Sequence, residues 1–144
     1  MPDQSPDTEH ARRVVLLDND PAVLDLLVLD LELEGHEILA AATDRAVAVE
    51  ACASLHPDVL IVDLRLGPGP DGIDVVTSIA DLGVRAVMYT NYITPEIVDR
   101  ANRHGITVVE KGNLGALRRA VVGSGPACAP EWSSRRLRDV FQGL

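Results

Sequence analysis

The stretch Val59-Leu60-Ile61-Val62-Asp63 decides the fold, because it is an apolar run that ends in a carboxylate and gives way to a glycine- and proline-rich loop. Apolar residues without polar alternation are typical of a central parallel strand that is covered on both faces. Asp63 is therefore expected at the carboxyl end of a buried strand. The loop Gly67-Pro68-Gly69-Pro70-Asp71-Gly72 cannot begin a helix before Gly72. Asp63 thus has no helix directly after it to cap, which makes it a candidate site residue.

A second apolar run repeats this pattern near the start of the chain. Residues 13–17 lead into Asp18, a second carboxylate. Pro21 suits the first position of a helix and Asp20 suits its N-cap. The sequence therefore predicts a buried strand, an acidic turn and a helix over 21–34 that stops at a glycine.

Strands and helices continue to alternate along the chain. Further strands are predicted at 38–42, 85–90 and 106–109, and further helices at 43–55 (capped by Thr43), 72–82, 95–104 and 113–122. Such alternation is typical of a parallel sheet with helices on both faces, joined by right-handed crossovers. The predicted fold class is α/β, a doubly wound five-stranded parallel sheet of order 2-1-3-4-5, whose ligand crevice lies at the carboxyl ends of strands one and three.

This topology brings four functional groups to one edge of the sheet. One group lies at or just after the end of each of strands one, three, four and five. In that order they are Asp18, Asp63, Thr90 and Lys111. Two carboxylates at close range repel each other unless a proton or a cation lies between them, and hard oxygen ligands of this kind favour Mg²⁺. A carboxylate beside Mg²⁺, with an ammonium and a hydroxyl nearby, has the parts needed to transfer a phosphoryl group to an aspartate. Asp63 is the predicted nucleophile.

Residues 12–123 resemble a receiver domain of a bacterial two-component response regulator, a family with a flavodoxin-like fold. The matching features are the acidic turn 17–21, Asp63-Leu64-Arg65 with Asp71-Gly72 downstream, Thr90 in Met88-Tyr89-Thr90-Asn91, and Lys111. The resemblance implies that Asp63 accepts a phosphoryl group from a histidine kinase. It also implies that the chain is not an enzyme beyond its own Mg²⁺-dependent phosphorylation and dephosphorylation.

The resemblance assigns a role to each residue at this edge. The residues implied to surround Mg²⁺ are Asp18, Asn19, Asp63 and Arg65, the last through its backbone carbonyl. Thr90 and Lys111 would hold the phosphoryl group as catalytic partners of Asp63. Their movement would carry the signal to the face built from the fourth helix, the fifth strand and the fifth helix.

Four departures from the family pattern bear on these roles. Asn19 stands where a second acid is usual, and it offers a carbonyl oxygen but no charge, so metal binding should be weaker. The loop from Asp63 to Asp71 is one residue longer than usual, which would alter how the Arg65 carbonyl is presented. Gly112 replaces the usual proline after the lysine, so the cis peptide found there in the family is in question. Val108 stands where many members carry an aromatic switch residue.

Composition limits size, partners and location. With 144 residues, 47% of them hydrophobic, the chain can bury the core of one domain. A formal net charge of −9 argues against nucleic-acid binding, so DNA contact is expected only through an output domain not present in this chain. Cys52 and Cys128 lack zinc-ligand spacing, which indicates a reducing compartment. No apolar run approaches the ~18 residues of a membrane span, so a cytoplasmic protein without membrane contact is predicted. The histidines at element boundaries, His36 among them, are expected to be solvated.

Three segments are predicted: a disordered leader (1–11), the receiver-like domain (12–123), and a linker with an amphipathic C-terminal helix (124–144). The last segment has an apolar stripe of Leu137, Val140, Phe141 and Leu144, with Arg135, Arg136 and Arg138 opposite. Such a helix could pack on its own domain, mediate a homodimer, or connect to a DNA-binding output domain of the LuxR type that controls transcription. We favour the connector.

Two other functions stay open. Asn19, the longer loop and Gly112 are also compatible with a receiver-like interaction module that works without phosphorylation. Asp18-Asn19-Asp20, with Thr90 and Lys111 downstream, is compatible with a phosphatase of the haloacid-dehalogenase type. The absence of a further acid pair and the unexplained Asp63 count against the phosphatase.

Overall fold

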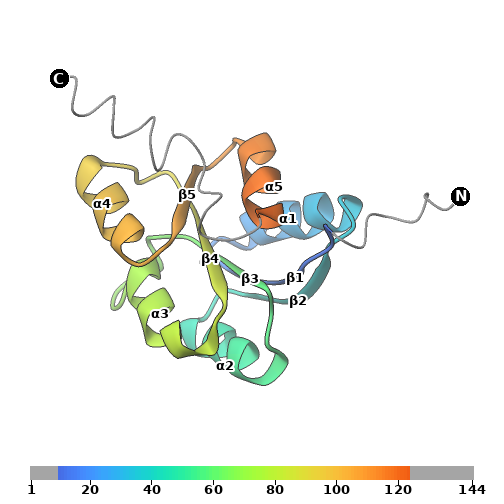
Figure 1. The fold of residues 1–144 in the computed structure, drawn as a ribbon, viewed down its shortest axis with the longest axis horizontal. Helices are drawn as coiled ribbons and strands as arrows, with labels where there is room; N and C mark the ends of the chain where they lie inside the picture. The colour runs from blue at the N-terminus through green and yellow to red at the C-terminus, as the bar shows by residue number, and fades with distance from the viewer. Residues whose placement is uncertain (1–9, 124–144) are drawn as a thin grey trace, which may run out of the picture.

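The computed structural model describes residues 10–123, which form a five-stranded parallel sheet with helices on both faces (Figure 1). The strands are β1 (Arg13–Leu17), β2 (Glu37–Ala42), β3 (Val59–Val62), β4 (Arg85–Thr90) and β5 (Thr107–Glu110). The helices are α1 (Pro21–Leu33), α2 (Arg45–Leu55), α3 (Gly72–Ser78), α4 (Pro95–Arg103) and α5 (Leu114–Val122). The strand order β2-β1-β3-β4-β5 confirms the predicted fold class.

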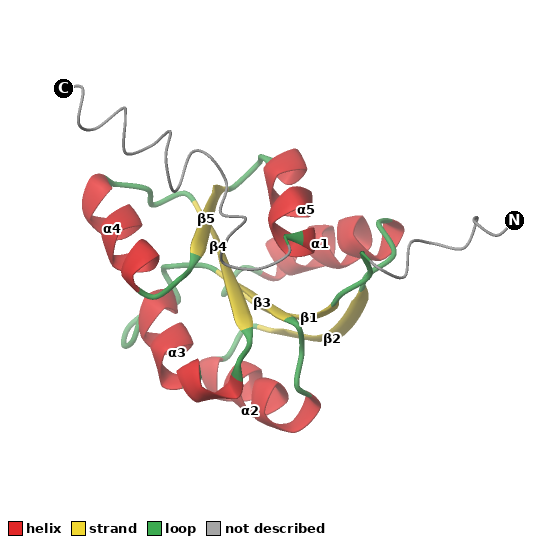
Figure 2. Ribbon diagram, viewed as in Figure 1, coloured by secondary structure: helices red, strands yellow, loops and turns green. Residues whose placement is uncertain are grey.

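Two apolar cores, one on each face of the sheet, hold the layers together. On one face α1 and α5 cover the sheet (Figure 2), and Leu27, Leu31 and Leu117 are buried there. On the other face α2, α3 and α4 cover it, with Cys52 and Ile73 among the buried residues. Burial of apolar surface on both faces is the main free-energy term that favours this arrangement.

β3 is the central strand, and its side chains enter both cores. Val59 and Ile61 pack under α1 and α5, whereas the other two residues of the strand pack on the opposite face. None of the four is more than 2% exposed, as expected for a strand without polar alternation. Pairing with β1 places Leu17 opposite Val62. The residue after each of these strands, an aspartate in both cases, therefore leaves the sheet at the same edge.

The start of α1 follows the predicted capping chemistry. Asp20 Oδ1 accepts the backbone N–H of Ala22 at 3.0 Å, and Pro21 occupies the first helical position. The Asp20 side chain satisfies one of the unpaired N–H groups at the helix start, and proline has no N–H group that needs a partner. After the helix, Gly35 adopts a left-handed conformation with φ of 96°. This prediction is confirmed, and it assigns the Asp20 side chain to a structural role.

The cap of α2 differs from the prediction by one residue. Asp44, not Thr43, is the N-cap, and its Oδ1 accepts the N–H groups of Ala46 at 2.7 Å and Val47 at 3.3 Å. Both residue types are good caps. A carboxylate also gains from the positive end of the helix dipole, which favours the aspartate.

The predicted helix over 72–82 is interrupted. α3 ends at Ser78, and a separate short 3-10 helix covers Ala80–Leu82 before Gly83 turns the chain with φ of 74°. The hydroxyls of Thr77 and Ser78 donate to the carbonyls of residues 73 and 75. Side-chain hydrogen bonds of this kind compete with the regular ladder and favour a break.

Part of the predicted domain organisation lies outside the described residues. Residues 1–9 of the predicted leader and the whole predicted linker and C-terminal helix, 124–144, fall there, as does Cys128. Within residues 10–123, no helix is long and apolar enough to cross a membrane.

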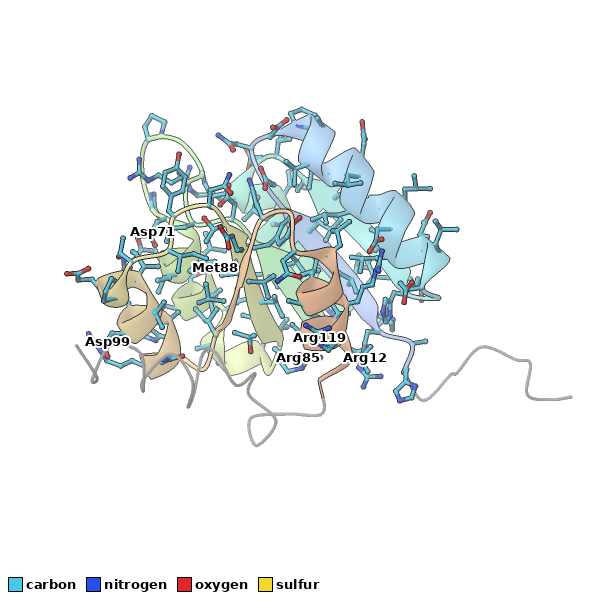
Figure 3. The ribbon with its side chains drawn as sticks, turned by 90° about the horizontal axis from the view of Figure 1, so that it is seen from above. Arg12, Asp71, Arg85, Met88, Asp99 and Arg119 are labelled. Atoms are coloured by element: carbon cyan, nitrogen blue, oxygen red, sulfur yellow. The ribbon has the colours of Figure 1, made fainter. Side chains whose placement is uncertain are left out.

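Arginines fix the C-terminal end of α5 against the sheet. Arg85 donates to the carbonyls of Ala120 and Val121, and Arg12 donates to the carbonyl of Val122 at 2.9 Å. The labelled Arg12 and Arg85 lie beside this helix end (Figure 3). Cationic donors satisfy the last carbonyls of a helix and oppose the negative end of its dipole.

His36 is buried, which contradicts the expectation that it is solvated. It is 6% exposed, and its Nδ1 accepts the backbone N–H of Arg12 at 3.0 Å. Burial lowers the pKa of His36 from its usual 6.5, and the charge of Arg12 lowers it further against the opposing effect of Glu34 and Asp30. The fold therefore holds this imidazole neutral, as an acceptor. The boundary position gave no sign of this, because the partner of the ring, Arg12, comes from the segment before β1 and is distant in sequence.

We expect His36 to make the fold sensitive to mild acid. Its folded pKa is depressed, so its contribution to stability is present above pH 6.5 and is lost as pH falls through the folded pKa. His36→Gln keeps a side-chain carbonyl as acceptor and removes the titration. Between pH 7.5 and 5, the free energy of unfolding measured in urea should fall less for this variant than for wild type, whereas exposed His104→Gln should match wild type. An equal fall in wild type and His36→Gln would contradict the assignment.

Candidate functional site

Three charged side chains meet at the carboxyl edge of the sheet. The Nζ of Lys111 lies 2.9 Å from Asp18 Oδ2 and 3.0 Å from Asp63 Oδ2. The two carboxylate side chains are only 4% and 5% exposed, and the lysine side chain is 17% exposed. The convergence predicted from strand order is therefore confirmed for these residues, and the ammonium lies between the two acids.

The backbone places each of these groups. The N–H of Asp18 donates to the carbonyl of Ala42 at 3.1 Å, and the N–H of Asp63 donates to the carbonyl of Leu17 at 3.1 Å. Both bonds extend the parallel ladders by one residue beyond the strands. Lys111 is attached in the same way, because its N–H donates to the carbonyl of Thr90 at 3.0 Å. The backbone positions of these three residues are thus fixed by the sheet and not by a loop.

The electrostatics of Asp18 and Lys111 reflect this close pairing. Burial raises the pKa of Asp18 and outweighs the hydrogen bonds from the Asp20 N–H and Lys111, while the charge of Asp63 raises it further. Burial opposes the charged form of Lys111, but its hydrogen bonds and Coulomb attraction to both acids prevail and raise its pKa. The lysine is therefore held protonated, and the pocket carries two acids for one ammonium.

One oxygen in this pocket has no partner. Among the described residues, Asp63 Oδ1 is the only buried side-chain nitrogen or oxygen that makes no hydrogen bond. An unpaired buried oxygen is unfavourable by roughly 1–3 kcal/mol. A ligand that contacts Asp63 Oδ1 would remove this cost, so the oxygen marks a candidate binding position. No group of three or more His, Cys, Asp or Glu that could hold a metal occurs in residues 10–123. A cation here would need other donors besides the two acids.

The other two predicted metal donors are Asn19 and the backbone carbonyl of Arg65. Asn19 is exposed and follows Asp18 directly in the acidic turn. The guanidinium of Arg65 is stacked 4.2 Å from the ring centroid of Tyr92, so its side chain is turned toward the loop after β4. A metal role for the Arg65 carbonyl stays a prediction. These donors are carbonyl oxygens, which fit a hard cation such as Mg²⁺.

Thr90 is fully buried at the end of β4. Its Oγ1 accepts the backbone N–H of Tyr92 at 3.1 Å, so the hydroxyl is oriented by the following loop and its own proton stays available for donation. A backbone bond from the Lys111 N–H to the Thr90 carbonyl joins the ends of β4 and β5 at this edge. The structure thus places Thr90 at the predicted edge of the sheet.

The start of α3 is packed directly against the backbone of Asp63. The N–H of Gly72 donates to the carbonyl of Leu64 at 2.8 Å, and a Cβ at position 72 would lie 2.2 Å from the carbonyl oxygen of Asp63. Asp71 caps this helix in a reciprocal capping box with Asp74. Only glycine permits this approach, so the Asp-Gly pair serves the position of Asp63.

A forked ion pair joins this helix start to α4. The guanidinium of Arg100 donates to Asp71 at 3.0 and 3.3 Å, and the labelled Asp71 lies on the α4 side of the sheet (Figure 3). Burial tends to raise the pKa of Asp71, but the bonds from Arg100 and Asp74 prevail and lower it. Sequence reasoning missed this contact. The basic residues in the last turn of α4 were the available signal.

Tyr89 contacts one of the positions that depart from the family pattern. Its hydroxyl accepts the N–H of Gly112 at 2.9 Å, a bond that proline at this position could not make. No cis peptide bond occurs in residues 10–123, and Val108, a further departure, is fully buried. The hydroxyl of a β4 residue thus holds the turn after Lys111.

Comparison with known proteins gives a consistent result. The family model described as the response regulator receiver domain matches residues 14–119. The "DNA-binding response regulator MtrA" of Mycolicibacterium smegmatis is 39% identical over 80 residues, which is 55% of this chain and 34% of that protein. The chain thus spans about a third of the length of this curated relative.

Solved structures support the fold. A two-component response regulator of the LuxR family from Aurantimonas matches with a TM-score of 0.73 at 22% identity, covering 92% of this chain and 97% of the other. The CheX–CheY–BeF3–Mg complex from Borrelia burgdorferi matches with a TM-score of 0.69 at 21% identity, covering 76% and 85%. At these identities the likeness concerns the fold.

We expect Gly72→Ala to destabilise the fold by about 3 kcal/mol, because its Cβ would overlap backbone that cannot move without displacing Asp63. The matched control is Gly115→Ala in α5, whose Cβ would meet its nearest atom at 3.6 Å. Alanine there should stabilise the protein by roughly 0.5–1 kcal/mol. Urea unfolding measures both. A loss below about 1 kcal/mol for Gly72→Ala would contradict the close approach.

Asp18→Asn should stabilise the metal-free protein by about 1 kcal/mol at pH 7, because it removes one of two buried negative charges. The raised pKa of Asp18 means that the folded state resists its ionisation. The gain should therefore be full above that pKa and vanish as pH falls below 3.8, where the acid is protonated in both states. Urea unfolding at several pH values tests this, with exposed Asp81→Asn as control. A loss of stability at pH 7 would contradict it.

Proposed function

This chain belongs to the family of response regulator receiver domains, whose model matches residues 14–119, and on that premise we propose that Asp63 accepts a phosphoryl group from a histidine kinase. The single observation that carries the proposal is the state of the Asp63 carboxylate. One of its oxygens is held by Lys111 and the other is buried without a partner. A nucleophile held in this way is oriented, and it has one oxygen to offer to a ligand.

The proposed reaction moves a phosphoryl group from nitrogen to oxygen. A carboxylate oxygen of Asp63 attacks phosphorus and forms an O–P bond, while the N–P bond of the phosphohistidine breaks and its electron pair returns to the imidazole. Hydrolysis of the acyl phosphate by water restores the carboxylate and releases phosphate. The chain itself then acts as a switch and not as an enzyme that turns over an external substrate.

Lys111 and Thr90 supply positive charge and a hydrogen-bond donor. Lys111 already donates to Asp63, and the same ammonium can pair with a phosphoryl oxygen bound to that carboxylate. The Thr90 hydroxyl retains its proton for donation. The bond from the Lys111 N–H to the Thr90 carbonyl keeps the two residues at neighbouring strand ends, from which both side chains could reach the same phosphoryl group.

Mg²⁺ fits the donor set of this pocket, and the residues that would hold it are Asp18, Asn19, Asp63 and the carbonyl of Arg65. When bound, it would neutralise charge on the phosphoryl oxygens. Lys111 already compensates part of the negative charge of the two acids. With Asn19 neutral, we expect the affinity to be lower than that of a site with three acids.

The output that we favour is control of transcription in the cytoplasm. A relative matched here is named as a DNA-binding response regulator, and this chain spans only part of it. With a formal net charge of −9, the chain itself is not suited to DNA contact, so an output domain of the LuxR type is the proposed DNA-binding element. A homodimer is the proposed form in which such an output would act.

A phosphorylation-independent interaction module is the second candidate, favoured by the exposed, uncharged Asn19 in the acidic turn. The phosphatase alternative is weakened, because Asp20, its second acid, is engaged as the cap of α1.

Intact-mass measurement after treatment with acetyl phosphate and Mg²⁺ tests the proposal. Wild type should gain one phosphate, and Asp63→Asn should gain none because the nucleophilic oxygen is lost. Asp81→Asn, an exposed acid away from the pocket, should behave as wild type. When Mg²⁺ is chelated before the treatment, wild type should gain no phosphate.

Other outcomes point to the alternatives. No adduct on wild type, with acetyl phosphate and with a phosphorylated kinase, would support the interaction module. Continuous release of phosphate that Asp18→Asn abolishes and Asp63→Asn does not would support a phosphatase.

A further inference from the structure

The loop between β3 and α3 is wrapped around one guanidinium. Arg45, the first residue of α2, donates through Nε to the carbonyl of Pro70 at 2.7 Å. The Nη2 of Arg45 donates to three further carbonyls, those of Leu66 at 3.3 Å, Gly67 at 3.2 Å and Pro68 at 2.9 Å. Four carbonyls of one loop thus point at a single side chain from another element.

The loop adopts this path because its residues allow it. Gly67 and Gly69 have φ of +93° and +106°, a region that other residues avoid. An added Cβ at Gly69 would lie at an ordinary contact distance of 3.6 Å from the Arg45 guanidinium, so Gly69 lies beside that group. The planar fork of arginine offers several donors at fixed angles, whereas lysine presents a single ammonium. The contact is therefore specific to arginine.

Arg45 acts on the part of the loop that has no other support. At one end, the Gly72 N–H is bonded to the Leu64 carbonyl, and Asp71 is held by Arg100. At the other end, Asp63 is bonded to β1. Between these points, residues 67–70 are exposed and lie in neither helix nor strand. Arg45 is the group that the structure shows bound to this segment.

We propose that Arg45 is a positioning residue for the Asp63 site, which sets the course of the loop and so the direction of the Arg65 carbonyl. This inference deepens the proposed function and rests on it where it concerns Mg²⁺ and phosphoryl transfer. The Arg45 contacts fall within residues 66–70, in the loop that the resemblance makes one residue longer than the family pattern. Arg45 touches neither Asp63 nor Asp18 and acts only through the loop.

The first test measures the loop itself, in the metal-free protein. Backbone ¹⁵N relaxation should give order parameters of about 0.85 at Leu66, Gly67 and Gly69 in wild type and below about 0.6 in Arg45→Gln, because the loop carbonyls lose their partner. Arg45→Lys should give intermediate values, because it keeps charge without the fork. Arg103→Gln, which removes an exposed arginine paired within α4, should leave the loop unchanged. Unchanged order parameters in Arg45→Gln would overturn the proposal.

The second test measures Mg²⁺ affinity by calorimetry. Arg45→Gln should weaken binding about tenfold, as expected when a group that orients a ligand is removed. The thermal midpoint should change by less than about 3 °C, since the contacts lie at the surface. In phosphorylation by acetyl phosphate, the Mg²⁺ concentration for half-maximal rate should rise while the maximal rate changes little. A merely structural role would instead lower stability and leave the affinity of the folded protein unchanged.

The outcomes separate this inference from the function on which it rests. Lower loop order parameters with unchanged Mg²⁺ affinity would overturn the positioning role. If wild type binds no Mg²⁺ and takes up no phosphate, the proposed function fails, and the loop order parameters alone then decide whether Arg45 holds the loop.

Discussion

The ammonium of Lys111 between the carboxylates of Asp18 and Asp63 is the interaction on which the rest of the site depends. Two buried acids at this distance repel each other, and burial penalises each charge further. One cation shared by both offsets part of this repulsion, while the sheet fixes the positions of all three groups through backbone bonds. The remaining negative charge and the unpaired oxygen of Asp63 make the pocket receptive to a further cation.

Backbone periodicity accounts for the success of sequence reasoning at the centre of this site. An apolar run without alternation indicates a buried parallel strand, and strand order then places the residues after β1, β3 and β5 at one edge. The convergence of Asp18, Asp63 and Lys111 could therefore be predicted from strand order alone. Capping at Asp20 was also accessible, because an acid followed directly by proline is typical of a helix start.

Contacts made by long side chains could not be predicted in this way. Arg45 and Arg100 reach across to a loop whose path depends on glycine conformations, and sequence spacing does not fix that path. Tyr89 could have been suspected, since Gly112 offers an N–H where proline has none, but its partner follows only from the packing of β4 beside β5. The N-cap of α2 shows the same limit: the sequence predicts Thr43, and Asp44 is observed. Both residue types can cap a helix, and only the backbone geometry decides between two neighbours.

The forked pair between Arg100 and Asp71 has a consequence for how α4 is attached. Two parallel bonds fix the relative orientation of the two groups as well as their separation, and they join the last turn of α4 to the start of α3. That helix start sits on the backbone of Asp63 with no room for even a methyl group. Contacts therefore run without interruption from the acid pocket to an outer helix that lies more than thirty residues further along the chain.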